Sequence, residues 1–313
     1  KATATTLKKQ NKAELKSWKQ VVANDLFAAT TLVQNASAVE RLADDTLDGI
    51  AAKRSAWAQA SQQAGQSTLA KLADTYVAAF LAPKVPQREA HIPLSGYLWS
   101  LLHPNPHQPP QPELAQAAHD LCRAHSVFHW WLAFPQVAAK VGFAVMLGNP
   151  PWERIKLQEE EFFATRHPAV AAAQNKAERT RYINALSQGQ LAHLLASAGI
   201  GTPLPEGGSA AEKRLYAEFI AARRVAEATS VFMHADGSDG GRYPLTGVGD
   251  VNTYALFAET ILQITAPTGR AGFIVPTGIA TDDSTKAYFG HISQTGRLVC
   301  LYDIENRDAL FAS

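Results

Sequence analysis

Cysteine and methionine are scarce in this sequence, with two of each among 313 residues. The cysteines, Cys122 and Cys300, lie far apart and form no Cys-x-x-Cys pair, which excludes a disulfide framework and a cysteine-based zinc site. This usage is typical of a reducing compartment, so we expect a cytoplasmic protein. His119, His125 and His129 lie near helical spacing but lack a fourth ligand, and we expect no metal site.

An excess of charge and long apolar runs are also lacking. Twenty-nine Lys and Arg against 28 Asp and Glu leave a formal net charge of +1, which excludes a protein that coats nucleic acid by charge alone. Contact with nucleic acid then needs a local patch, such as Arg154, Lys156, Arg179 and Arg181, although such charges usually only solvate helices. No run reaches the roughly 18 apolar residues of a membrane helix, so we expect no membrane contact.

Hydrophobic residues, at 46% of the chain, suffice for one large domain or two ordinary ones. The first part, residues 1–125, predicts helices, because apolar residues such as Leu69, Leu72 and Tyr76 recur at helical spacing. The segment 83–112 interrupts them with prolines too close together for regular structure, and we expect a loop there.

The second part, residues 126–313, predicts strands as well as helices. The apolar run 142–147 ends abruptly at Gly148, the pattern of a strand buried on both faces, and further strands are expected over 271–275 and 297–304 with helices between them. Strands that alternate with helices indicate an α/β fold with a parallel sheet. Because three strands are too few for a complete doubly wound sheet, we expect an incomplete one.

The tetrapeptide Asn149-Pro150-Pro151-Trp152 follows the first expected strand, where ligands bind in open parallel sheets. Two consecutive prolines stiffen the backbone and remove two amide donors, which leaves carbonyl acceptors beside the Asn amide. An amide oxygen, a fixed carbonyl and a broad aromatic ring suit a flat base that carries an exocyclic amino group.

Further blocks surround this tetrapeptide in a fixed order: Phe128-His129-Trp130, Phe134-Pro135, Gly142-Phe143, Glu153-Arg154-Ile155-Lys156, the segments Gly249 to Phe257 and Gly269 to Thr281, and Tyr302-Asp303-Ile304-Glu305-Asn306. With Gly148-Asn149-Pro150-Pro151-Trp152, they resemble the large adenine-N6 DNA methyltransferases of type IIG restriction-modification and phage-defence systems. The resemblance extends from about Ser126 to Phe311 and is weaker in the helical part.

The resemblance implies a partial class I (Rossmann-like) methyltransferase sheet with a large α-helical N-terminal insertion. It implies that Asn149 and the Pro150 carbonyl, held rigid by Pro151, bind the N6 amino group of an adenine flipped out of double-stranded DNA, and that Trp152 stacks on the base. The methyl donor would be S-adenosylmethionine. Further candidates to line the pocket are Gly148, Pro276, Asp303, Glu305 and Asn306.

The sequence departs from this family in one respect, because it contains no glycine-rich turn directly after a strand to bind the cofactor. Gly199-Ile200-Gly201 follows a helical stretch and Gly247-Val248-Gly249 follows a loop. The cofactor-binding residues are therefore unknown, and we expect a fragment that is inactive alone and needs the rest of its parent polypeptide, with a cofactor half, a target-recognition domain and defence-system subunits as partners. The alternative is a non-catalytic module that contacts DNA or other subunits.

Overall fold

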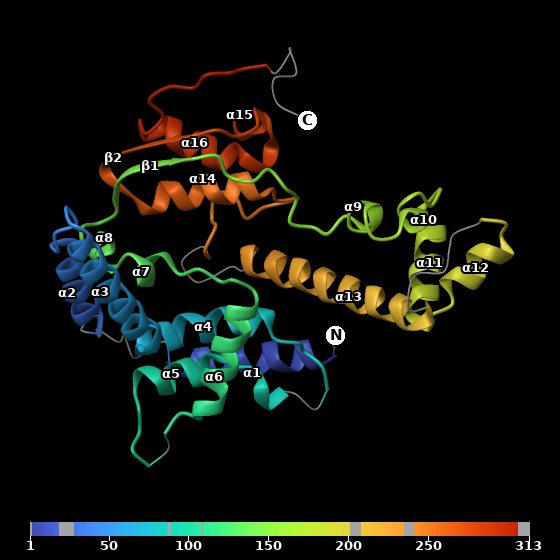
Figure 1. The fold of residues 1–313 in the computed structure, drawn as a ribbon, viewed down its shortest axis with the longest axis horizontal. Helices are drawn as coiled ribbons and strands as arrows, with labels where there is room; N and C mark the ends of the chain where they lie inside the picture. Colours follow the sequence, from blue (N-terminus) through green and yellow to red (C-terminus); the bar gives the residue numbers. More distant parts are fainter. Residues whose placement is uncertain are drawn as a thin grey trace. The chain divides into compact units, whose positions relative to one another are not determined.

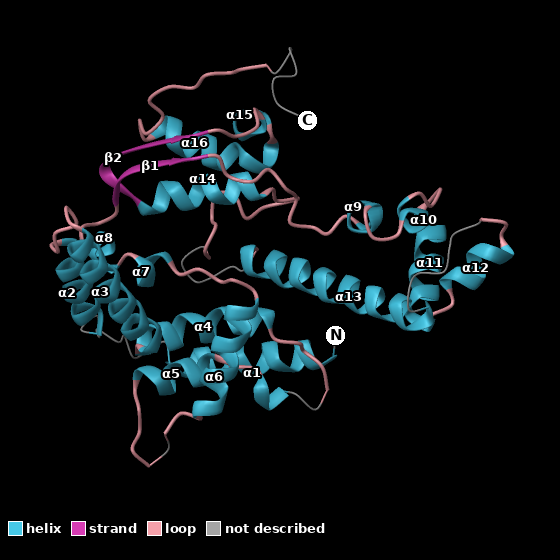
Figure 2. Cartoon of the chain, in the orientation of Figure 1, coloured by secondary structure: helices cyan, strands magenta, loops and turns pink. Residues whose placement is uncertain are grey.

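The structure is a computed structural model that describes residues 2–18, 28–86, 89–107, 109–200, 208–234 and 241–305. Helices dominate these ranges, and a two-stranded parallel sheet lies among them (Figures 1 and 2). The chain is therefore α/β, as the sequence predicts, but mostly helical. No helix in the described ranges combines the length and apolarity that a membrane span requires.

Two compact units make up the chain. The first comprises Lys1–Asn149 and Thr260–Ile274, and the second comprises Pro150–Glu259 and Val275–Ser313. The boundary expected near residue 125 lies inside the first unit.

The helices of the first unit pack through separate hydrophobic clusters. In one cluster, Ala78 of α4 lies against Ala118 and Cys122 of α6, where the absence of large side chains lets the two helices approach closely. Local signals start several of the helices: the Thr46 hydroxyl caps α3, the Ser67 hydroxyl caps α4, and a proline begins α6. The elements are α1 (Ala2–Trp18), α2 (Ala28–Glu40), α3 (Leu47–Gln66), α4 (Thr68–Leu81), the 3-10 helix η1 (Glu89–His91), α5 (Ser95–Leu102), α6 (Pro112–Ala124), α7 (Trp130–Ala133) and α8 (Pro135–Ala139).

The loop predicted over 83–112 is wrong in part, because helix α5 (Ser95–Leu102) forms within it. This stretch contains no proline, and its first backbone amides are bound by side chains of α1. Asn11 Oδ1 accepts from the Ser95 amide at 2.8 Å, and Glu14 Oε2 accepts from the Gly96 amide at 2.7 Å. A helix needs partners for its first N–H groups, and here they come from a distant part of the sequence.

The sheet pairs β1 (Phe143–Gly148) in parallel with β2 (Thr265–Phe273). The pairing runs in register from Val145 opposite Arg270 to Gly148 opposite Phe273, after an irregularity in which β2 contains extra residues. Gly269 lies in this irregularity, and a Cβ atom there would lie 2.6 Å from the Phe143 carbonyl oxygen, so only glycine fits. The expected strands at 142–147 and 271–275 thus correspond to the two strands of one sheet.

Two expectations about the sheet are not met. The predicted strand over 297–304 does not form, since residues 297–305 have no regular secondary structure. Strand β1 is not buried on both faces either, because Val145 is 59% exposed and Leu147 is 79% exposed. The reason is the same in both cases: apolar, strand-forming residues become a buried strand only where neighbouring strands and covering helices exist, and the described residues supply β1 with a single neighbour.

A hydrophobic core in the second unit holds α9 to α13 together. Its buried members include Phe162 and Phe163 of α9, Leu186 of α11 and Phe219 of α13. The three phenylalanine rings contact one another. Helices α10 and α11 are separate because the Asn175 side chain caps a new helix start. The elements are α9 (Glu159–Ala164), α10 (Pro168–Ala171), α11 (Lys176–Gln188), α12 (Leu191–Ser197), α13 (Gly208–Met233), α14 (Thr253–Ile264, whose last residues belong to the first unit), α15 (Gly278–Thr281), the 3-10 helix η2 (Asp283–Thr285) and α16 (Lys286–Gln294).

A buried carboxylate joins α13 to α12 within this core. Glu212 is 2% exposed, and its two oxygens accept hydrogen bonds from the amides of Leu191 at 2.9 Å and Ala192 at 2.8 Å. These are the first two amides of α12, which have no acceptor within the helix. Glu212 therefore satisfies the start of α12 and fixes it against α13.

We expect Glu212→Ala to lower the free energy of unfolding by about 2–4 kcal/mol, because it leaves two buried amides without acceptors. The matched control is Glu218→Ala, an exposed glutamate on the same helix, which should change stability by less than about 0.5 kcal/mol. Urea denaturation followed by circular dichroism measures both. Equal losses in the two variants would contradict the anchoring role.

Candidate functional site

The tetrapeptide Asn149-Pro150-Pro151-Trp152 follows β1 directly. The last residue of the strand, Gly148, accepts a hydrogen bond from the Ile274 amide at 3.2 Å, which continues the pairing of β1 with β2 to the edge of the motif. Asn149 is exposed and ends the first unit, and Pro150, which is buried, begins the second. Trp152 is 53% exposed. No hydrogen bond within the described residues involves the Asn149 side chain or the Pro150 carbonyl, so both acceptors lack a donor there; of the two, the Asn149 side chain is the exposed one.

The residues after the prolines pair with the start of α14. The Thr253 amide donates to the Glu153 carbonyl at 2.9 Å, the Ile155 amide donates to the Val251 carbonyl at 3.3 Å, and residues 154 and 252 form an antiparallel bridge. The Thr253 hydroxyl lies 2.7 Å from the Pro151 carbonyl oxygen and 3.0 Å from that of Glu153. The backbone on both sides of Trp152 is thereby held to one helix terminus.

Helix α14 provides a firm support for these contacts. Tyr254, Ala255 and Leu256 are at most 4% exposed, directly after Thr253. Burial, with a contribution from the nearby Asp282 carboxylate, raises the pKa of Tyr254, so its hydroxyl stays neutral and protonated. Further along the helix, Glu259 is 1% exposed and accepts hydrogen bonds from the amide and hydroxyl of Thr246, which fixes the preceding loop to the helix.

The candidates for the pocket wall are only partly brought together. Pro276 lies at the start of α15, where its carbonyl accepts from the Ile279 amide at 3.0 Å. The neighbouring Thr277 hydroxyl donates to Asp303 Oδ1 at 3.2 Å, so the 276–277 turn and Asp303 are adjacent. Glu305 is exposed, and Asn306 lies outside the described residues.

Thr253 is a residue of this region for which the sequence indicates no role. It lies inside the Gly249 to Phe257 block, but a threonine at a helix start carries no signal of a distant partner. The helix α14 begins at this threonine, directly after Asn252. The sequence can therefore indicate the helix but not what its first residue binds.

The aromatic block before β1 has a packing role. The Trp130 ring contacts those of Phe128, Phe134 and Phe143, with centroids 5.2 to 5.9 Å apart, which connects the segment around α7 to the first residue of β1. Edge-to-face and stacked contacts of this kind stabilise a core beyond the burial of area. These rings position the start of β1, and the first unit contains all of them.

Two histidines share one carboxylate in the first unit. His119 Nδ1 and His129 Nε2 each lie 2.9 Å from an oxygen of Asp74, a residue of α4. Burial raises the pKa of Asp74, but the hydrogen bonds and charges of His129 and His119 together outweigh burial, so the pKa is lowered from 3.8. Burial, with the Asp74 charge, raises the pKa of the nearby Cys122 thiol to about 12. Within the described ranges, no three His, Cys, Asp or Glu side chains are arranged to hold a metal ion.

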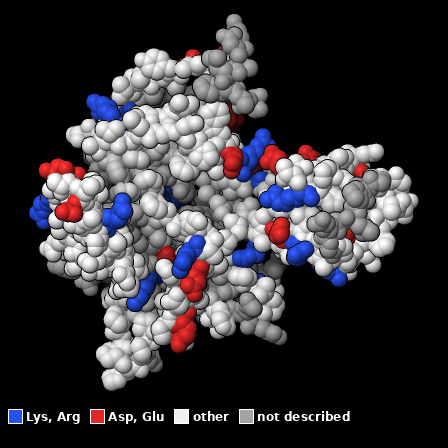
Figure 3. All heavy atoms as spheres, viewed as in Figure 1, with Lys and Arg blue, Asp and Glu red and all other residues white. Residues whose placement is uncertain are grey.

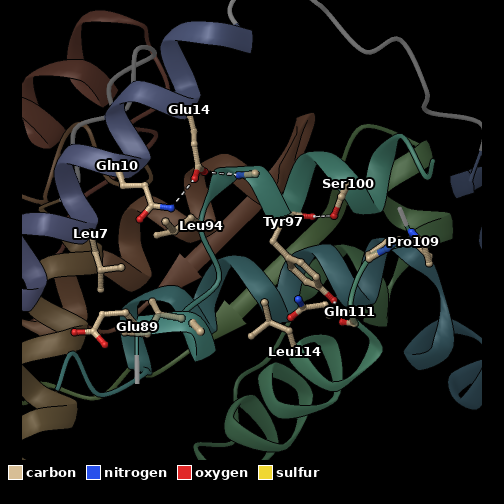
Figure 4. Close-up of a pocket in the computed structure, with 14 residues that line it drawn as sticks. Leu7, Gln10, Glu14, Glu89, Leu94, Tyr97, Ser100, Pro109, Gln111 and Leu114 are labelled. Carbon is tan, nitrogen blue, oxygen red and sulfur yellow. Dashed lines mark hydrogen bonds between the residues drawn. The ribbon is translucent and has the colours of Figure 1, made fainter. Parts of the chain in front are cut away.

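A cavity of about 460 Å³ lies in the first unit, between α1, η1, α5 and the residues before α6 (Figure 4). Its polar side chains bind groups of the protein itself. Gln10 Nε2 donates to Glu14, Glu14 accepts from the Gly96 amide, and the Tyr97 hydroxyl donates to the Gln111 carbonyl. None of the site residues predicted from the sequence lines it, so these polar groups serve the structure of the helical region.

Charges of both signs are interspersed on the face shown in Figure 3. In the stretch expected to form a local basic patch, Arg179 is buried, forms an ion pair with Glu160 at 2.7 Å and approaches the Ala171 and Ala173 carbonyls. Arg181 lies over the ring of Tyr182. Arg179 is thus not available to DNA phosphates, and the patch is smaller than the sequence suggests.

Comparisons with family models, curated proteins and solved structures find no significant match to this chain.

The Asp74 cluster predicts a dependence of stability on pH. Because the pKa of Asp74 is lowered on folding, its stabilisation is complete above the unfolded value of 3.8 and is lost as the pH falls through the lower folded value. We expect Asp74→Asn to lower the free energy of unfolding by about 1–3 kcal/mol at pH 7, and this difference to shrink below pH 4 as Asp74 is protonated in the wild type. Denaturant titrations between pH 3 and 7 measure it, with the exposed Asp45→Asn as control. A difference that does not change with pH would contradict the assignment.

Proposed function

We propose that this chain carries the target-base site of an adenine-N6 DNA methyltransferase of the type IIG restriction-modification or phage-defence kind. One observation carries the proposal. Asn149 and the Pro150 carbonyl have no donor among the described residues, whereas the Pro151 and Glu153 carbonyls around the half-exposed Trp152 are bound by Thr253. The motif therefore combines two acceptors that have no hydrogen-bond donor among the described residues with an aromatic ring on a fixed backbone, which suits a flat base with an amino group.

The proposed chemistry follows from these groups. Hydrogen bonds from the two N–H groups of the amino nitrogen to Asn149 and to the Pro150 carbonyl draw that nitrogen toward tetrahedral geometry and free its lone pair for attack on a methyl group. The same acceptors stabilise the positive charge that develops on the nitrogen. Stacking on Trp152 holds the base, which has to be flipped out of the double helix to reach this position. The contribution of the chain is positioning and electrostatics, without a covalent intermediate.

S-adenosylmethionine is the methyl donor that we propose, but the described residues do not fit it. Gly199 follows α12 with a φ of 71°, a conformation that helix C-termini favour, and Gly247 packs against the Met233 and Tyr243 carbonyls. Neither glycine follows a strand. We therefore assign no residue here to the cofactor, and propose that other segments of the protein hold it.

The exposed side chains of β1 also support the proposal that another segment of the protein binds the cofactor. We propose that β1 and β2 belong to a larger Rossmann-like sheet and that Val145 and Leu147 are covered there by the cofactor-binding part. The apolar side chains Val299 and Ile304, 75% and 85% exposed, would be covered in the same way.

The alternative is a non-catalytic module that contacts DNA or other subunits. It would be favoured if Asn149 and Trp152 were packed shut. Both are exposed instead, which supports the catalytic function.

The Asn149→Ala variant tests the function. We expect the natural full-length polypeptide that contains these residues to transfer labelled methyl groups from S-adenosylmethionine to N6 of adenine in mixed-sequence DNA, and Asn149→Ala to lower the rate about 100- to 1,000-fold, as for loss of one transition-state hydrogen bond. The control is Asn184→Ala, an exposed asparagine on α11, which should retain full activity. A folded wild type that methylates no DNA would refute the proposal in favour of the non-catalytic module.

The proposed sheet is tested by Leu147→Ser. In this chain alone, where Leu147 is 79% exposed, the free energy of unfolding should change by less than about 0.5 kcal/mol. In the full-length polypeptide, where we propose that the side chain is buried, the loss should be about 2 kcal/mol or more and visible as a lower Tm. Val231→Ser on α13, 61% exposed, is the control. Equal effects of Leu147→Ser in both contexts would contradict the larger sheet.

A further inference from the structure

Thr253 makes three of the hydrogen bonds that hold the backbone on both sides of Trp152. Its hydroxyl reaches the Pro151 carbonyl at 2.7 Å and the Glu153 carbonyl at 3.0 Å, and its amide donates to the Glu153 carbonyl at 2.9 Å. A hydroxyl carries a single hydrogen, so it shares that hydrogen between the two carbonyls or alternates between them. Either way, one side chain orients the Pro151–Trp152 and Glu153–Arg154 peptide groups, one on each side of Trp152.

Thr253 is itself firmly placed. It is the first residue of α14, and the residues that follow it, Tyr254 to Leu256, are buried. The Ile155 amide donates a hydrogen bond to the Val251 carbonyl, which holds the segment after Trp152 to the residues before α14. A functional side chain held by a rigid element keeps its geometry better than one on a free loop.

The contact also distinguishes the two proline carbonyls. That of Pro151 accepts a hydrogen bond from the Thr253 hydroxyl, whereas that of Pro150 has no donor among the described residues. We propose that Thr253 is a positioning residue: through the Pro151 and Glu153 carbonyls, its hydroxyl sets the direction in which Trp152 presents its indole to the target base. This role rests on the proposed function.

The test compares Thr253→Val, which keeps the shape and removes the hydroxyl, with Thr253→Ser, which keeps the hydroxyl. Methyl transfer is measured in the natural full-length polypeptide. We expect Thr253→Val to lower kcat about 10- to 100-fold, the effect of a small misplacement of a positioned group, with KM for DNA changed less than about threefold. Thr253→Ser should stay within about threefold of the wild type. The matched control is Thr180→Val on α11, whose exposed hydroxyl bonds only the Lys176 carbonyl.

A double-mutant cycle separates positioning from general stability. If Thr253 acts through Trp152, Thr253→Val should have little further effect on kcat in a Trp152→Ala background, whereas a merely structural loss would add to it. Hydrogen exchange, followed by mass spectrometry, should also show faster exchange of the Thr253 and Ile155 amides in Thr253→Val.

The outcomes distinguish this inference from the proposed function. An active wild type with Thr253→Val equal to Thr180→Val, or with additive losses in the cycle, would overturn the role of Thr253 and leave the function intact. A folded wild type that methylates no DNA would overturn the proposed function and, with it, any role of Thr253 toward a base.

Discussion

The bond network between the turn after β1 and the first residue of α14 is the contact on which the candidate site depends. Two consecutive prolines leave this turn with carbonyl acceptors and no amide donors of their own. A helix start has the opposite imbalance, with amides that lack acceptors. Thr253, which donates from both its amide and its hydroxyl, joins the two. The site is thus stabilised by hydrogen bonds from donors at the start of α14 to carbonyl oxygens of the turn, although Thr253 and Pro151 lie 102 positions apart in the chain.

The same principle operates at other buried or half-buried points. Glu212 accepts the first amides of α12, and Glu14 and Asn11 accept those of α5. Glu259 binds the amide and hydroxyl of Thr246. In each case a side chain distant in sequence satisfies backbone groups that local structure leaves unpaired. Because a buried polar group without a partner is costly, these contacts determine where the short helices of this chain lie.

Sequence reasoning succeeds where the signal is local. The apolar run that ends at Gly148 indicates β1. It fails where the cause is distant. Helix α5 was missed because its capping side chains lie on α1, 82 and 84 residues away. For the same reason the sequence pointed to Asn149 and Trp152 but assigned no role to Thr253.

The strand expected over 297–304 shows a different limit. Its residues have the composition of a strand, but a strand forms only when another strand pairs with it. Composition therefore predicts that a segment is able to form a strand, not that it does so. Apolar side chains remain exposed at Val299 and Ile304, and at Val145 and Leu147 of β1. These residues keep the ability to join a larger sheet. Among the described residues, β1 has a single strand neighbour, and Val145 and Leu147 remain exposed on it. An α/β sheet is covered on both faces, so these side chains mark where further strands or covering helices would extend this one.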